Sequence, residues 1–134
     1  MTHRAQVKRR ERRLHRSNDA GRALRRWLAA VTGRARVAGL VVADGEGLVI
    51  AASLSRRHAE ELAALAPLLV RRNVAGRRLL DLFEMPISVA EVELGWDTLL
   101  LCAVGEADRR EAALEEAAAG VRRIIEELVG LRAA

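Results

Sequence analysis

Residues with reactive side chains are few in this sequence, and their spacing does not form a catalytic or metal-binding motif. The three histidines, His3, His15 and His58, stand apart, and no cysteine or histidine pair has the spacing of metal ligands. Cys102 is the single cysteine, so no internal disulfide can form. A free cysteine inside an apolar run is typical of a packed core. We therefore predict no bound metal and no cofactor.

Three carboxylates in predicted turns, Asp44, Glu46 and Asp97, are the remaining candidates for acid–base chemistry. No base or nucleophile stands beside them, and carboxylates in turns are usually solvated. The Gly-Glu-Gly segment at 45–47 has the spacing of a phosphate-binding loop. However, Ile50 takes the place of its third glycine, and the segment joins two predicted strands instead of preceding a helix. We predict that the protein is not an enzyme.

Length and composition indicate one folded domain. The chain has 134 residues, of which 51% are hydrophobic and 31% are charged. Its longest apolar runs, 37–43 and 99–104, are far shorter than the roughly 20 residues that a membrane-spanning helix needs. No apolar segment follows the charged N-terminus, so the sequence predicts no secretory signal. Together with the single cysteine, this favours a cytoplasmic location.

Charge is distributed unevenly along the chain. Residues 1–36 carry 12 lysines or arginines and 2 acids, whereas residues 37–134 carry 11 arginines and 16 acids. Blocks of like charge are typical of disordered segments or interaction tails. We therefore expect residues 1–16 to form a flexible, arginine-rich arm. Its seven cations are Arg4, Lys8, Arg9, Arg10, Arg12, Arg13 and Arg16.

Hydrophobic periodicity predicts a single domain over residues 17–130, followed by a short tail at 131–134. Apolar residues at helical spacing predict helices, and apolar runs bounded by turn residues predict strands. The expected helices are 17–32, 56–74 and 109–129. The expected strands are 36–43, 48–53, 78–84, 87–94 and 98–104. The segment 77–84 also suits a helix, and both interpretations remain open.

The second predicted helix has an apolar stripe too wide for one packing surface. Its central leucines are Leu62, Leu65, Leu68 and Leu69. Pro67 lies among them, where it removes a backbone donor and clashes with the carbonyl of Ala63, so we expect a kink or a break. In the first helix, Ser17 is the expected N-terminal cap and Gly33 the expected end.

The segment 37–53 carries a resemblance to a known family. Its sequence is Val-Ala-Gly-Leu-Val-Val-Ala-Asp-Gly-Glu-Gly-Leu-Val-Ile-Ala-Ala-Ser. This resembles the first hairpin of the roadblock / dynein light chain family, an apolar strand followed by Asp-x-Glu/Asp-Gly and Leu-Val-Ile-Ala-Ser. The segment 58–65 resembles the second helix of that family, and the order of elements agrees over residues 17–130.

The resemblance implies an α/β, profilin-like fold in the order α-β-β-α-β-β-β-α. A five-stranded antiparallel sheet would lie between the second helix on one side and the first and last helices on the other. Family members form homodimers or heterodimers, joining third strands edge to edge and packing second helices together. They are not enzymes. They bind or regulate Ras-like small GTPases, often across the paired second helices, in bacterial polarity and gliding systems and in eukaryotic scaffolds.

Carried over to this chain, the resemblance implies a dimeric module that regulates or scaffolds a small Ras-like GTPase. The second copy would be the chain itself or another roadblock chain. The implied dimer or partner interface consists of Leu62, Leu65, Leu68 and Leu69. The implied partner rim consists of Glu60, Glu61, Arg71 and Arg72.

The arginine-rich arm is not part of the family pattern and leaves an alternative function open. It could bind nucleic acid, an anionic membrane surface or an acidic protein, although it has no aromatic residue on which bases could stack. A helix-turn-helix over 57–80, with Arg77 and Arg78 facing phosphate, is a weaker variant. Pro67 interrupts its first helix, and the neighbouring strands fit such a domain poorly.

Overall fold

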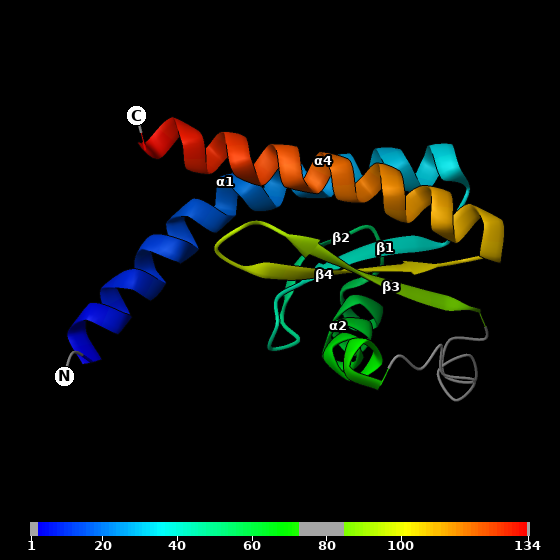
Figure 1. Cartoon of the computed structure of the whole chain (residues 1–134), viewed down its shortest axis with the longest axis horizontal. Helices are drawn as coiled ribbons and strands as arrows, with labels where there is room; N and C mark the ends of the chain where they lie inside the picture. The colour runs from blue at the N-terminus through cyan, green and yellow to red at the C-terminus, as the bar shows by residue number, and fades with distance from the viewer. Residues whose placement is uncertain (1–2, 73–84, 134) are drawn as a thin grey trace.

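The computed structural model describes residues 3–72 and 85–133, with side chains described at 19–71 and 85–128. Three helices and four strands follow one another along the described chain (Figure 1). The helices are α1 (His3–Ala35), α2 (Arg56–Arg72) and α4 (Ala107–Ala133). The strands are β1 (Gly39–Ala43), β2 (Val49–Ala52), β3 (Ile87–Glu93) and β4 (Thr98–Val104). None of the helices in the described ranges is both long and apolar enough to cross a membrane.

The four strands form one antiparallel sheet in the order β2-β1-β4-β3. Helix α2 lies on one face of this sheet, and α1 and α4 lie side by side on the other (Figure 1). The predicted α/β sandwich is confirmed at this level. The expected strand 78–84 lies outside the described residues, so a fifth strand remains a prediction.

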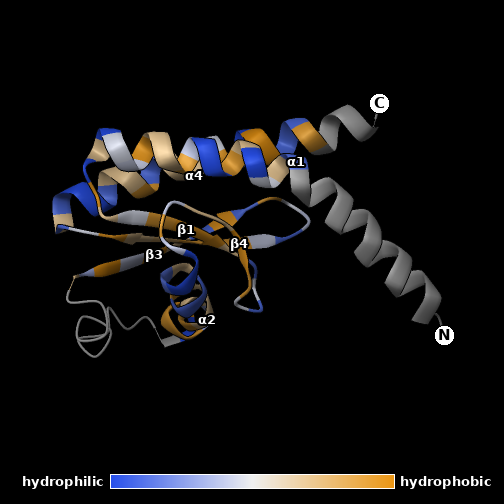
Figure 2. Ribbon diagram, turned by 180° about the vertical axis from the view of Figure 1, so that it is seen from behind, coloured by the Kyte–Doolittle hydropathy of each residue, from blue (hydrophilic) through white to orange (hydrophobic). Residues whose placement is uncertain are grey.

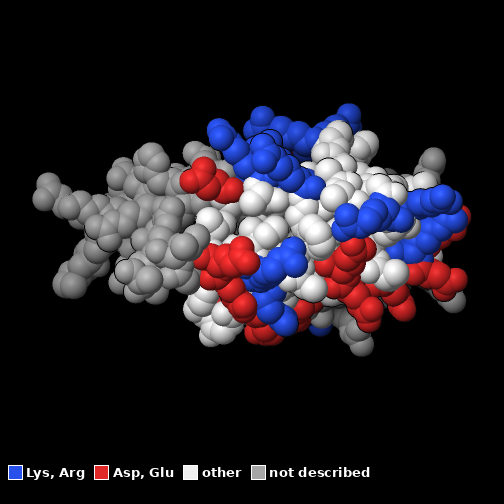
Figure 3. All heavy atoms as spheres, turned by 90° about the horizontal axis from the view of Figure 1, so that it is seen from above, with Lys and Arg blue, Asp and Glu red and all other residues white. Residues whose placement is uncertain are grey.

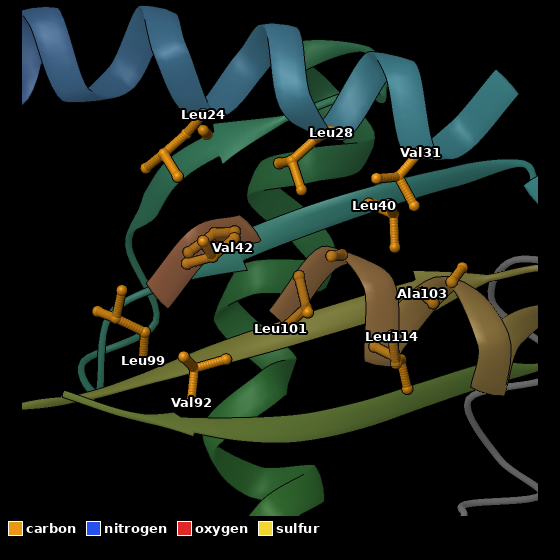
Figure 4. Close-up of a cluster of buried hydrophobic side chains, with 14 of the residues drawn as sticks. Leu24, Leu28, Val31, Leu40, Val42, Val92, Leu99, Leu101, Ala103 and Leu114 are labelled. Carbon is orange, nitrogen blue, oxygen red and sulfur yellow. The ribbon is translucent and has the colours of Figure 1, made fainter. Parts of the chain in front are cut away.

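Alternation along the central strands divides the core into two clusters. On β1, Leu40 and Val42 face the α1 and α4 layer, where they pack with Leu101 of β4 (Figure 4). The intervening Val41 packs with Cys102 on the α2 side. Successive strand residues point to opposite faces, so a strand covered on both sides is apolar at every position. This is why the runs at 37–43 and 99–104 contain almost no polar residue.

Helices α1 and α4 lock together around one indole ring. The Trp27 Nε1–H donates a hydrogen bond to the backbone carbonyl of Ala117, within α4, at 3.1 Å. The guanidinium groups of Arg34 and Arg123 lie 5.4 Å and 5.3 Å from the ring centroid. A Cβ on Gly120 would lie 2.0 Å from the ring, so the glycine makes room for it. The two helices therefore form one continuous layer.

Helix α1 is longer than the apolar pattern indicated. It begins at His3, so residues 3–16 of the expected arm are helical in the structure, and Ser17 is not its cap. Periodicity misses this stretch because it has no apolar stripe, although arginine, lysine and glutamine are good helix formers. The helix also passes Gly33 and ends at Ala35, where Arg36 takes a left-handed φ of 56°. The Val37 N–H then donates to the Thr32 carbonyl at 3.3 Å.

Pro67 does not break α2. The helix continues through the proline to Arg72, so of the expected kink or break, the break is wrong. The missing N–H removes one intrahelical bond, but the inner side of the helix stays packed on the sheet through Leu62, Ala63 and Ala66. Tertiary packing of an amphipathic helix commonly outweighs one unfavourable residue. The wide leucine stripe is therefore presented on a single continuous helix.

Candidate protein-interaction surface

Two halves of α2 differ in character on their solvent side. The first half carries charged residues, and the second half is apolar, as the change in ribbon colour along α2 in Figure 2 shows. Ser55 caps the helix, because its Oγ accepts from the His58 N–H at 3.4 Å and lies 2.9 Å from His58 Nδ1. The cap fixes where the helix begins and which residues face outward.

The charged residues in the first half of α2 form ion pairs with one another. Glu60 pairs with Arg56 at 3.0 Å, and Glu61 pairs with Arg57 at 3.4 Å, each one helical turn apart and exposed. Exposed pairs of this kind contribute well under about 1 kcal/mol, so a partner can displace them at little cost. The predicted rim residues Glu60 and Glu61 are therefore accessible to a partner, while the arginines hold their side chains in place.

The predicted leucine interface is split by its helical spacing. Leu62 is fully buried in the cluster that packs on the sheet, and Leu69, seven residues later, is nearly fully buried as well. Leu65 is half-buried, and Leu68 is 48% exposed. The structure therefore places Leu62 and Leu69 in the core of this chain. Only Leu65 and Leu68 have surface to offer a partner.

Ala64 is exposed beside these two leucines and completes a small apolar area, called here the α2 patch (Ala64, Leu65 and Leu68). The β1–β2 turn lies against this part of the helix. A Cβ built on Gly47 would lie 3.1 Å from the Ala63 carbonyl oxygen and 3.2 Å from the Ala64 Cα. Leu48, the next residue of the turn, is 62% exposed.

Sequence reasoning missed Leu48, because a leucine after Gly47 looks like the start of a buried strand. The remaining predicted residues lie at the edges of what is described. Arg71 is exposed near the end of α2, and Arg72 is the last residue of that helix, with its side chain outside the described residues. The side chains of the arm also lie outside them, although the arm's backbone belongs to α1 from His3 onward.

Two of the three candidate carboxylates, Asp44 and Asp97, form hydrogen bonds that stabilise turns. Asp44 Oδ1 accepts from the backbone N–H groups of Glu46 and Leu48, each at 2.9 Å, and Asp97 Oδ1 accepts from the Thr98 N–H at 2.8 Å. These are the bonds of side chains that close tight turns. Among the described side chains, no group of three or more histidines, cysteines or acids could hold a metal ion.

The one thiol is buried and neutral. Desolvation by burial raises the pKa of Cys102 to about 12, so its nucleophilic thiolate form is scarce at neutral pH. Cys102 pairs in register with Val41 of β1 and Val89 of β3, in the middle of the sheet. Its role in the described structure is that of a core residue, as the sequence predicted.

An antiparallel sheet with one helix on one face and the first and last helices on the other is the architecture that the roadblock resemblance implied. Comparison with solved structures finds the same class of fold. Myxococcus xanthus MglB matches with a TM-score of 0.51 at 16% identity, covering 79% of this chain and 90% of that one. The chain therefore has the fold of MglB, a roadblock-domain protein.

Two further MglB structures match less closely. A structure described as MglB with tetrameric arrangement gives a TM-score of 0.47 at 18% identity, over 85% of this chain and 90% of that one. The gliding protein MglB from Thermus thermophilus gives 0.43 at 16% identity, over 84% and 90%. No family model matches the sequence, and no curated protein matches it.

Proposed function

We propose that this protein is a non-enzymatic, dimeric interaction module that binds a small Ras-like GTPase and regulates or scaffolds it in the cytoplasm. The single observation that carries the proposal is the fold shared with Myxococcus xanthus MglB, a gliding regulator, over 90% of that chain. The described residues support it with an accessible surface on α2.

The α2 patch is the proposed contact between two copies of the chain. Leu68 exposes 48% of its surface on a helix whose inner side is already satisfied by the sheet. Burying such side chains against a second α2 removes apolar area from water at about 25 cal/mol per Å². A dimer made in this way joins two α2 helices.

Glu60, Glu61, Arg71 and Arg72 form the proposed GTPase-binding rim. The glutamates are exposed and held only by weak ion pairs, and Arg71 is exposed at the other end of the helix. A rim that carries both signs of charge orients a partner and speeds its association, and it contributes less to affinity. Self-association and GTPase binding therefore depend on different residues, which makes them separable by mutation.

The test of GTPase binding is a pull-down from nuclease-treated lysate, with the chain as bait and a non-hydrolysable GTP analogue added. The proposal expects a P-loop protein of the Ras-like class to be retained and identified by mass spectrometry. Charge reversal with Glu60→Arg and Glu61→Arg is expected to lose it. The matched control reverses Glu126 and Glu127, two exposed glutamates on the opposite side of the sheet, and is expected to keep it. Equal retention by all three baits contradicts the rim assignment.

A further inference from the structure

Helix α1 exposes arginines that have no acidic partner. Arg22, Arg25 and Arg26 are exposed, and none of them forms an ion pair with any described side chain. Arg34, near the other end of the same helix, is paired with Glu116 of α4 and contacts Trp27. Among the described arginines of α1, the three without an ion pair thus precede the packed end of the helix.

Some arginines on the other helices are paired with nearby acids. Arg56 and Arg57 of α2 and Arg109 of α4 each lie within 4 Å of a glutamate three or four positions away. Figure 3 shows the contrast on the α1 and α4 layer, where blue side chains gather along the α1 side and both colours mix over α4.

Arg71 of α2 and Arg122 and Arg123 of α4 also form no ion pair with a described side chain. What sets α1 apart is that positions 20–35 contain no acidic residue, whereas Glu126 and Glu127 follow Arg122 and Arg123 by one helical turn.

Unpaired cations at one-turn spacing repel one another unless an anion lies between them. Between His3 and Ala35, α1 contains 11 lysines or arginines and 2 acids, and only Lys8 is not an arginine. Guanidinium groups bind phosphate oxygens through two parallel hydrogen bonds, which ammonium groups cannot do. The chemistry of this surface therefore selects a partner that presents many phosphates. We propose that α1 docks on the phosphate backbone of a nucleic-acid duplex.

A duplex fits the described α1 surface better than a membrane does. Helices that lie on a membrane insert large apolar side chains, but the exposed positions between these three arginines and the end of α1 are Ala29, Ala30, Gly33 and the ion-paired Arg34. The large exposed apolar residues of the described structure all lie on other elements: Leu48, Val49, Leu68, Met85 and Trp96. Binding to α1 is therefore electrostatic.

Adjacent cations also favour a groove over a flat surface. Arg25 and Arg26 are consecutive, and consecutive helical positions lie about 100° apart around the axis. A planar anionic surface touches one side of a helix, whereas the major groove of a duplex is about 12 Å wide and has phosphates along both sides. This spread of charge suits a helix flanked by two phosphate strands.

Base recognition and single-strand binding have less support. The indole of Trp27 is committed to the Ala117 carbonyl and to two guanidinium groups, so it offers no free ring for stacking. Trp96 is exposed but lies in the β3–β4 turn, away from α1 in the sequence and on a different element. The proposed binding is therefore independent of base sequence and strongly dependent on salt.

The test measures the anisotropy of a fluorescein-labelled 20-base-pair duplex of arbitrary sequence, titrated with the full chain between 50 and 200 mM NaCl. The triple variant Arg22→Ala, Arg25→Ala and Arg26→Ala is expected to weaken binding by about tenfold or more. Its log–log salt slope is expected to fall by about 1 for each arginine that contacts phosphate. All three side chains are exposed, so the melting temperature of the variant should stay within a few degrees.

The matched control removes three arginines elsewhere, with Arg56→Ala, Arg57→Ala and Arg109→Ala. It lowers the net charge by the same amount, so it is expected to keep wild-type affinity only if binding is local to α1. A loss equal to that of the α1 variant overturns the proposal, as does no duplex binding at 50 mM NaCl. Vesicles containing phosphatidylserine are titrated in parallel, and binding to vesicles without binding to the duplex assigns α1 to a membrane instead.

Discussion

Gly120 occupies the middle of α4 because Trp27 fills the space that a side chain would take. The nearest ring atom lies 2.0 Å from the position of a Cβ there, far closer than two carbon atoms can approach. Glycine in a helix interior costs about 1 kcal/mol relative to alanine, and the packed indole offsets that cost. The glycine at position 120 is therefore explained by the contact between the first and last helices.

Two glycine-to-alanine substitutions, compared with each other, test whether Trp27 fills the space of a side chain at position 120. Gly120→Ala forces the indole to move and is expected to destabilise the protein by about 2–3 kcal/mol. Gly33→Ala, in α1, has open space at its Cβ position and is expected to stabilise by about 0.5–1 kcal/mol. Urea unfolding of both variants measures the difference. Effects of the same sign would contradict the assigned role of Trp27.

The buried thiol gives the stability of the protein a dependence on alkaline pH. The pKa of Cys102 is raised to about 12 in the folded chain, from a value of 9.0 for an unperturbed thiol. Between these values the unfolded state loses the proton and the native state keeps it, so stability falls as pH rises above about 9. The slope is at most about 1.4 kcal/mol per pH unit.

Cys102→Ala is expected to flatten this dependence. The chain has no tyrosine, so few other groups titrate in that range. Free energies of unfolding measured in urea at pH 8, 9 and 10 give the slope for both proteins. A parallel decline in wild type and variant would show that another group is responsible. Reaction of the native thiol with iodoacetamide at pH 8 should be slow, and unfolding in urea should accelerate it.

At the scale of elements, the β1–β2 turn and α2 are fitted together backbone to backbone. Gly47 has a φ of +89°, and its missing side chain lets the turn approach the Ala63 carbonyl. That carbonyl lacks its usual intrahelical donor, because the residue four positions later is Pro67. The proline and the glycine therefore both affect the surroundings of the Ala63 carbonyl. The predicted hairpin and the helix that contains Pro67 are connected through this carbonyl.

A comparison of Gly47→Ala with Gly95→Ala separates the cost of backbone strain from the cost of a steric clash at such a turn. Both glycines have positive φ, at 89° and 85°, so each alanine incurs backbone strain of about 1 kcal/mol or more. Only Gly47→Ala also meets a neighbour, since nothing lies within 4 Å of a Cβ on Gly95. We expect Gly47→Ala to cost about 1–2 kcal/mol more than Gly95→Ala in urea unfolding. Equal costs would mean that α2 shifts to accommodate the methyl group.

Most of the described elements were predictable because their residues follow simple periods. The strand at 98–104 and the last helix have unmistakable patterns, and the hairpin at 37–53 also carried the family resemblance. The extent of α1 was not predictable from apolar periodicity, because its first half has no apolar stripe. The passage of α2 through Pro67 was not predictable either, because packing on the sheet decided it.

The candidate interface was only partly predictable for a related reason. Four leucines on α2 share one wide stripe, and sequence alone cannot divide that stripe between the sheet and solvent. In the structure, the seven-residue spacing of Leu62 and Leu69 assigns both to the core, and Leu65 and Leu68 remain outside. Leu48 escaped notice because its neighbours look like a buried strand.

For the whole molecule, the two proposed surfaces lie on opposite faces of the sheet. Helix α2 covers one face and α1 with α4 covers the other (Figure 1). The variant Arg22→Ala, Arg25→Ala and Arg26→Ala should therefore keep the mass of the wild-type assembly in light scattering, expected at twice the 14.7 kDa chain. Leu65→Asp with Leu68→Asp should give the monomer mass, because burying two carboxylates in the α2 contact is unfavourable.

The matched control for that assembly test is Trp96→Asp, which removes a 58% exposed apolar residue from the β3–β4 turn. It should keep the dimer mass. A monomeric wild-type protein would contradict the dimer, and a dimer that survives both aspartates would place the contact elsewhere.

The most direct test of the central claim is titration calorimetry of the purified chain with the Ras-like GTPase that it retains from lysate, loaded with the GTP analogue. The account predicts saturable binding to the wild type. It also predicts a loss of at least tenfold in affinity on charge reversal at Glu60 and Glu61, with unchanged binding after reversal at Glu126 and Glu127. Absence of binding, or binding that is equal in all three proteins, would contradict it.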